Sequence, residues 1–147
     1  MGHWGVKSYE NDAAFDALDA GFDRVHGRLY DELMDDRNPL TVDQIHQRLA
    51  NPETLAASLE ALREEFGAEL EAWDEEAWLA FAGVVVRHAE LGVPIPEDLR
   101  QRAIAWLENE EIEWHEAAKR RLRRQAEVEL LRRVSPQSTQ RSPGEGG

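Results

Sequence analysis

Apolar side chains recur at intervals of three and four residues along most of this 147-residue chain. That spacing places them on one face of an α-helix, whereas a strand would need them at every second position. No stretch of five or more residues alternates apolar and polar side chains. The clearest helical series are Phe15, Leu18, Phe22, Val25 and Leu29, and later Leu55, Leu59, Leu62 and Phe66. The sequence therefore predicts an all-α fold, a compact bundle of about five helices.

Residues that satisfy the free backbone groups of a first turn mark where the predicted helices begin. Asn11 is a favourable N-cap, and Thr41 with Gln44 three residues later fits a capping box. The pair Asn51-Pro52 indicates another start, because proline is tolerated at a first helical position. Asp74 opens the most apolar segment of the chain.

The last predicted helix runs from Glu97 to about Val134, which is long for a single helix. A kink or a break near Asn109 is compatible with the pattern. Residues 1–134 are thus predicted to form one helical domain. Residues 135–147, SPQSTQRSPGEGG, are rich in serine, proline and glycine and predict a disordered tail.

Charge is distributed unevenly over a chain whose formal net charge is −13. Residues 1–116 carry 27 acidic and 9 basic side chains, a net charge of −18, and residues 117–147 carry 3 and 8, a net charge of +5. The anionic body would repel nucleic acids and anionic membranes, so neither is an expected partner. Cysteine is absent, which excludes disulfides and thiolate chemistry. Without a secretory signal or a membrane-spanning segment, the predicted location is cytoplasmic.

The N-terminal residues, MGHWGVKSYENDAAFD, resemble the start of a bacterial domain-of-unknown-function family. Its members begin M-G-x-W-G and continue with an aromatic residue and E-N-D-x-A-x-D; the matching positions here are Gly2, Trp4, Gly5, Tyr9, Glu10, Asn11, Asp12, Ala14 and Asp16. The chain departs from the family in Tyr9 and in Ala13, where a second aspartate is frequent. The resemblance covers about the first 16 residues. It implies a small, bacterial, cytoplasmic, mainly helical protein and brings no catalytic residues with it.

Trp4 is followed by Gly5, and the glycine gives the backbone beside the tryptophan conformational freedom. The indole can pack on the first predicted helix, or it can contact a ligand or partner. Burial of the indole would distinguish the two roles.

Four aspartates at spacings of four, three and four form a stripe along the first predicted helix: Asp12, Asp16, Asp19 and Asp23. They predict either a solvated face or a docking surface for a basic partner. A cation site is the alternative, and it would need histidines from other helices. The chain has no Glu-x-x-His and no His-Glu-x-x-His, so we expect no metal and no cofactor. The remaining candidate ligands are Asp23, His26, Glu111 and His115.

A basic run, K-R-R-L-R-R, follows a glutamate-rich part of the last predicted helix. These cations complement the negative end of the helix dipole. They also form a candidate surface for an acidic partner, for phosphates, or for the aspartate stripe of another copy; the residues are Lys119, Arg120, Arg121, Arg123 and Arg124. Apolar neighbours such as Leu122 make self-association through this helix an option.

Common enzyme motifs, namely G-x-S-x-G, the P-loop and G-x-G-x-x-G, are absent from the sequence. We therefore predict a non-enzymatic, cytoplasmic interaction or regulatory protein, such as an adaptor, inhibitor or immunity-like protein, with a basic protein partner. Its partner surface would include Trp4, the aspartate stripe or the basic run. The alternative is a metal-dependent or hydrolytic enzyme that uses the stripe with histidines from other helices. That alternative requires at least two of these residues to converge: Asp16, Asp23, His26, His46, His88 and His115.

Overall fold

The computed structural model describes residues 5, 7–35, 37, 39–112 and 116–133, and within them it contains helices and no strand. Seven α-helices and one short 3-10 helix follow in the order α1 (Asp12–His26), α2 (Arg28–Leu33), α3 (Val42–Leu49), α4 (Pro52–Phe66), η1 (Leu70–Ala72), α5 (Glu75–Glu90), α6 (Glu97–Asn109) and α7 (Ala117–Arg133). The predicted all-α class is confirmed, and the predicted number of about five helices is too low. The predicted tail at 135–147 lies outside the described residues.

The predicted helix starts are confirmed at four positions. The Asn11 side chain accepts a hydrogen bond from the Ala14 amide and caps α1. Thr41 caps α3 with the reciprocal capping box that the sequence predicts. Asn51 caps α4 and Asp74 caps α5 in the same way, through amides three residues on. These caps need only local sequence, which explains why the prediction succeeds.

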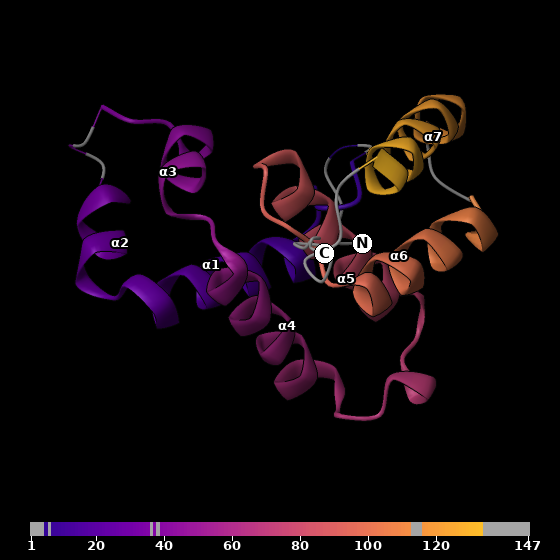
Figure 1. The fold of residues 1–147 in the computed structure, drawn as a ribbon, viewed down its shortest axis with the longest axis horizontal. Coiled ribbons are helices and arrows are strands. Elements are labelled where there is room, and N and C mark those ends of the chain that lie inside the picture. The colour runs from indigo at the N-terminus through magenta and orange to yellow at the C-terminus, as the bar shows by residue number, and fades with distance from the viewer. Residues whose placement is uncertain (1–4, 6, 36, 38, 113–115, 134–147) are drawn as a thin grey trace, which may run out of the picture.

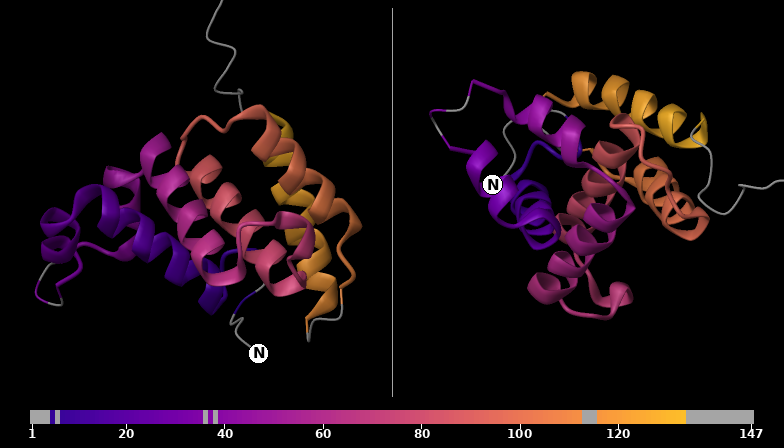
Figure 2. Two further views of the ribbon diagram at one scale, coloured as in Figure 1. Left: turned by 90° about the horizontal axis from the view of Figure 1, so that it is seen from below. Right: turned by 60° about the vertical axis from the view of Figure 1, so that its left-hand side comes forward.

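Two breaks account for the additional helices. Gly27 has a φ of +55°, a left-handed conformation that favours glycine, and it ends α1 so that α2 starts in a new direction. Leu29 therefore does not lie on the buried face with the rest of the predicted apolar series, and it is 48% exposed. The predicted long C-terminal helix is in fact two helices, because Glu110 is extended and α7 begins only at Ala117. Figure 2 shows α6 and α7 lying side by side.

Helix α5 is the centre of the fold. It contacts α1 and α4 on one side and α6 and α7 on the other (Figure 1). Every residue from Ala80 to Ala89 is buried, as expected for a helix that is apolar on nearly all sides. None of the helices among the described residues has the length and apolar character that a membrane span requires.

The segment that precedes α1 is packed into the interior. Ser8 has no exposed surface and Tyr9 is 9% exposed. The segment crosses α5 at Gly83, where a Cβ atom would lie 2.5 Å from the Ser8 carbonyl oxygen. Glycine at position 83 thus allows the backbone of this segment to approach the central helix.

Candidate functional site

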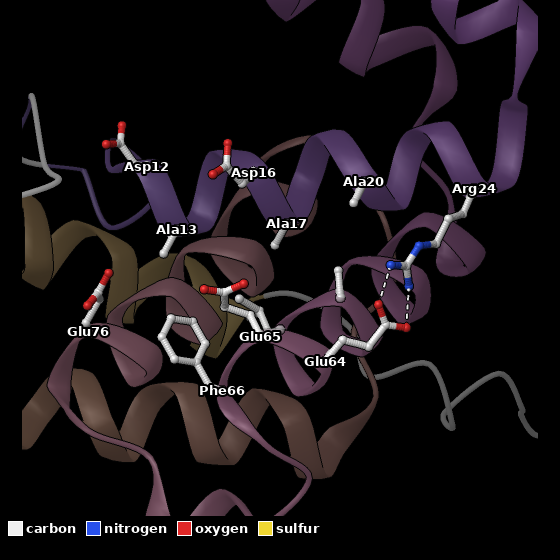
Figure 3. A pocket seen from close by; sticks show the side chains of 12 residues that line it. Asp12, Ala13, Asp16, Ala17, Ala20, Arg24, Glu64, Glu65, Phe66 and Glu76 are labelled. Atoms are coloured by element: carbon white, nitrogen blue, oxygen red, sulfur yellow. Dashed lines mark hydrogen bonds and ion pairs between the residues drawn. The ribbon is translucent and has the colours of Figure 1, made fainter.

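A groove of about 400 Å³ lies between α1, α4 and the first turn of α5 (Figure 3). The two helices α1 and α4 cross closely at Gly21, where a Cβ atom would lie 2.1 Å from the Ser58 hydroxyl oxygen. The groove has an apolar floor, formed by Ala13, Ala17 and Ala20 of α1 and by Ala61, Leu62 and Phe66 of α4. Three of these alanines follow one face of α1, and their short side chains let another chain segment approach closely.

Acidic side chains line the groove as well, and Figure 3 shows the Glu65 carboxylate between Ala17 and Phe66. The acidic lining residues are Asp12, Asp16, Glu64, Glu65 and Glu76, and Arg24 is the one basic residue among the lining. Arg24 donates two hydrogen bonds to Glu64, at 2.6 and 3.1 Å, and this pair closes one end of the groove (Figure 3). In a concave surface that has an apolar floor and side chains of one charge sign, the electrostatic field is concentrated and acts strongly on a bound ligand. We call this surface the acidic groove.

Only half of the predicted aspartate stripe belongs to the acidic groove. Asp19 instead accepts a hydrogen bond of 2.6 Å from the Tyr30 hydroxyl. Burial of Tyr30, together with this bond, raises the pKa of the tyrosine. Asp23 shares a hydrogen bond with Asp31, which raises the pKa of the Asp23 carboxyl from its ordinary value. The stripe therefore splits between the acidic groove and α2.

The candidate metal ligands do not converge in the described part of the chain. The His26 Nε2–H donates to the Leu49 carbonyl oxygen at 2.7 Å and ties α1 to the end of α3. Glu111 is exposed, and His115 lies outside the described residues. Where the structure is described, no three histidine or carboxylate side chains come together in a way that could hold a metal ion.

Two further histidines are buried in the core. The His88 Nδ1–H donates to the Val84 carbonyl oxygen, and His88 Nε2 accepts from the Thr54 hydroxyl at 2.8 Å. The His46 ring stacks on Phe22 with ring centres 4.5 Å apart, and its Nδ1 accepts from Arg87. Burial lowers the pKa of both imidazoles to about 4, so both are neutral at pH 7.

The basic run does not form one surface. Arg120 is completely buried and Arg123 is partly buried. Arg124 is half-buried and donates to the Glu110 carbonyl oxygen. Lys119 and Arg121 are exposed. The expected five-residue patch is therefore corrected: Arg120 has no surface to offer a partner, because it faces the core together with Val128 and Leu131.

Arg120 and Arg123 belong to a set of ion pairs that is fully buried at Arg120 and Glu127 and partly exposed at its Arg123–Glu90 end. We call it the inner ion network: Glu90, Glu110, Arg120, Arg123 and Glu127. Arg120 donates to Glu110 at 2.7 Å and to Glu127 at 3.1 Å. Glu127 also accepts from the Ser8 amide at 2.9 Å and from the Ser8 hydroxyl at 3.0 Å. The network thus fixes the segment before α1 against α7.

Tyr9 extends this attachment toward α5. Its hydroxyl donates to Glu90 at 2.7 Å, and its ring lies beneath the Arg87 guanidinium, 5.2 Å from the ring centre. Burial and the bond to Glu90 raise the pKa of Tyr9. Tyr9 thus packs against α5, and the neighbouring Asn11 caps α1 as predicted. Trp4, for which packing or partner contact was predicted, lies outside the described residues.

No family model, no curated protein and no solved structure matches this chain. The N-terminal resemblance therefore stays a prediction, and the function must be argued from the site.

Sequence reasoning missed most of the acidic groove and all of the inner ion network. Glu65, Phe66 and Glu76 lie on other helices than the aspartate stripe, so only the tertiary crossing brings them beside Asp16. The sequence does contain a pattern that indicates the network. Arg120, Glu127 and Leu131 share one helical face, which marks Arg120 as inward-facing once Leu131 is assigned to the core.

Proposed function

We propose that this protein is a helical binding module whose acidic groove captures a basic, amphipathic segment of a protein partner. The observation that carries the proposal is the combination of an apolar floor with five lining carboxylates. The floor favours burial of an apolar side chain, at about 25 cal/mol per Å². The carboxylates favour flanking lysine or arginine and disfavour acidic segments.

The shape of the groove supports a helical or extended peptide rather than a small molecule. Ala13, Ala17 and Ala20 line a channel along α1, and Phe66 faces them from α4 (Figure 3). An amphipathic helix that presents one apolar ridge fits such a channel. Binding of this kind suits an adaptor, inhibitor or immunity-like protein. The lack of cysteine and the N-terminal resemblance support a bacterial, cytoplasmic setting for that role.

The placement of the histidines favours binding over catalysis. A hydrolytic or metal-dependent use of the aspartate stripe would need histidines beside it. His26, His46 and His88 are instead bonded to Leu49, Arg87 and Thr54 respectively. These side chains hold helices together, and none of the three lines the acidic groove.

The test is a titration with a synthetic helix-forming peptide that has a leucine ridge flanked by lysines. Its control is the same peptide with every lysine replaced by glutamate. We expect the basic peptide to bind and the acidic one not to bind, with fluorescence anisotropy as the readout. Added salt should weaken binding, because the Debye length shortens from about 10 Å at 0.1 M to about 3 Å at 1 M.

A matched pair of triple variants locates the binding site. The first, Asp16→Asn/Glu65→Gln/Glu76→Gln, removes three groove charges, and we expect at least about tenfold weaker binding. The second removes three exposed charges outside the groove: Glu71→Gln/Asp98→Asn/Glu129→Gln. It changes the net charge equally and should bind like the unmodified protein. Equal binding by both variants, or equal binding of the two peptides, would contradict the proposal.

A further inference from the structure

The outward face of α7 has the chemistry that the acidic groove accepts. Leu122 is 72% exposed, the most exposed of the large apolar side chains in the described residues. Ala118 and Ala126 lie one turn before and after it and are also exposed, which gives a short apolar ridge. The exposed cations Lys119 and Arg121 flank this ridge. We call this surface the α7 ridge.

The α7 ridge cannot reach the acidic groove of its own molecule. The opposite face of α7 is anchored by Arg120 and Glu127 in the inner ion network, and α7 packs on α5 and α6. The acidic groove is formed by other helices, namely α1, α4 and the first turn of α5. Any contact between the two surfaces is therefore between two copies of the chain.

We propose that the acidic groove of one copy takes the α7 ridge of a second copy. Leu122 would lie on the floor formed by the alanines of α1 and by Phe66, and Lys119 and Arg121 would lie against the carboxylates that line the groove. The argument is complementarity of both charge and apolar surface between two faces of the same chain. This inference rests on the proposed function, because it uses the same groove and identifies one occupant of it.

The geometry makes this a heterologous contact, in which two different surfaces meet. Once two copies have joined, the pair keeps one free groove and one free α7 ridge, so the contact can add further copies and form chains or rings. A partner segment that binds the acidic groove would compete with the ridge. Self-association and partner binding are then mutually exclusive at each groove.

Sedimentation of the full chain over a range of concentrations tests the contact. At low salt we expect the mean mass to rise with concentration beyond that of a dimer, and high salt should reverse the rise. The groove variant Asp16→Asn/Glu65→Gln/Glu76→Gln and the ridge variant Lys119→Gln/Arg121→Gln/Leu122→Ser should each weaken self-association at least tenfold.

Mixing the two variants distinguishes this contact from other modes of association. The groove variant keeps an intact ridge, and the ridge variant keeps an intact groove. Together they should form a one-to-one complex that grows no further, because each has only one working surface. If α7 instead paired with α7 in a symmetric dimer, the mixture would not gain a complex, and the proposal would be wrong.

A third variant controls for loss of exposed apolar and cationic side chains in general. Arg28→Gln/Leu29→Ser/Arg48→Gln changes exposed residues of the same types on α2 and α3 and should associate like the unmodified protein. If the unmodified chain stays monomeric at every concentration, this inference fails. The peptide titration would still report on the proposed function in that case, so the two failures are distinguishable.

Discussion

The acidic groove and the inner ion network are both rich in charged side chains, but these side chains are solvated in the groove and paired with one another in the network. In the groove, carboxylates outnumber cations and face water. In the network, each carboxylate meets a guanidinium, and Arg120 and Glu127 have essentially no exposed surface. The same residue types thus stay solvated in one region and hold chain segments together in the other.

The difference between the regions follows from the cost of removing an ion from water. A buried charge is tolerated only when partners satisfy all its hydrogen-bonding atoms. Glu127 meets this condition through Arg120, Arg123 and both donors of Ser8. The groove carboxylates are exposed, so water solvates them and no complete set of protein partners is required.

Replacement of Glu127 by alanine should give the largest effect. Arg120 and the Ser8 amide would lose an ionic partner in the interior, so we expect the free energy of unfolding to fall by about 3–5 kcal/mol. Urea unfolding at pH 7 measures this loss. Glu129→Ala, an exposed position two residues away on α7, should stay within about 0.5 kcal/mol. Equal losses at the two positions would contradict the distinction between buried and exposed charge.

Acid should destabilise the interior through its two buried histidines. The folded-state pKa values of His46 and His88, about 4, lie below the unfolded value of about 6.5. The unfolded chain therefore binds protons first as the pH falls, and stability is lost between pH 6.5 and pH 4. At pH 5 the loss should be about 2 kcal/mol for each histidine. Urea unfolding at pH 7.5 and pH 5 measures it, and an NMR titration in which either ring protonates near pH 6.5 would contradict it.

Gly83→Ala tests the contact between the N-terminal segment and α5 and should have a smaller effect. The new methyl group would meet Ser8 and Tyr9 backbone atoms at 2.5–2.8 Å, so the segment must shift. We expect a loss of about 1–3 kcal/mol in the free energy of unfolding. Hydrogen exchange at the Ser8 amide should also become faster. Peptide binding in the acidic groove should not change, and a large loss of binding would show that the two regions are coupled.

The sequence predicts those parts of the fold that depend on neighbouring residues. Asn11, Thr41, Asn51 and Asp74 act as N-caps because the groups they bind lie three residues ahead. The break at Gly27 was not predicted, since the apolar series continues through it to Leu29. The interruption after Asn109 was anticipated as a kink or break, but not as two helices packed together.

The site was harder to predict because its residues meet only through tertiary packing. The aspartate stripe on α1 is visible in the sequence, and the structure confirms its spacing on the helix. Its division between the groove, Tyr30 and Asp31 depends on where α2 and α4 lie. The predicted basic surface was wrong at Arg120 for the same reason. Arg120 binds Glu110 and Glu127 in the interior, and these contacts form only through tertiary packing.

The bond between Ser8 and Glu127 joins residues that are 119 positions apart in the chain. During synthesis at roughly 5–20 residues per second, Ser8 would wait about 6–24 s for its acceptor to be added. The segment before α1 can reach its final position only after α7 has left the ribosome. Closure of the interior is therefore a late event on the folding route, and the bundle is completed by its first residues meeting its last helix.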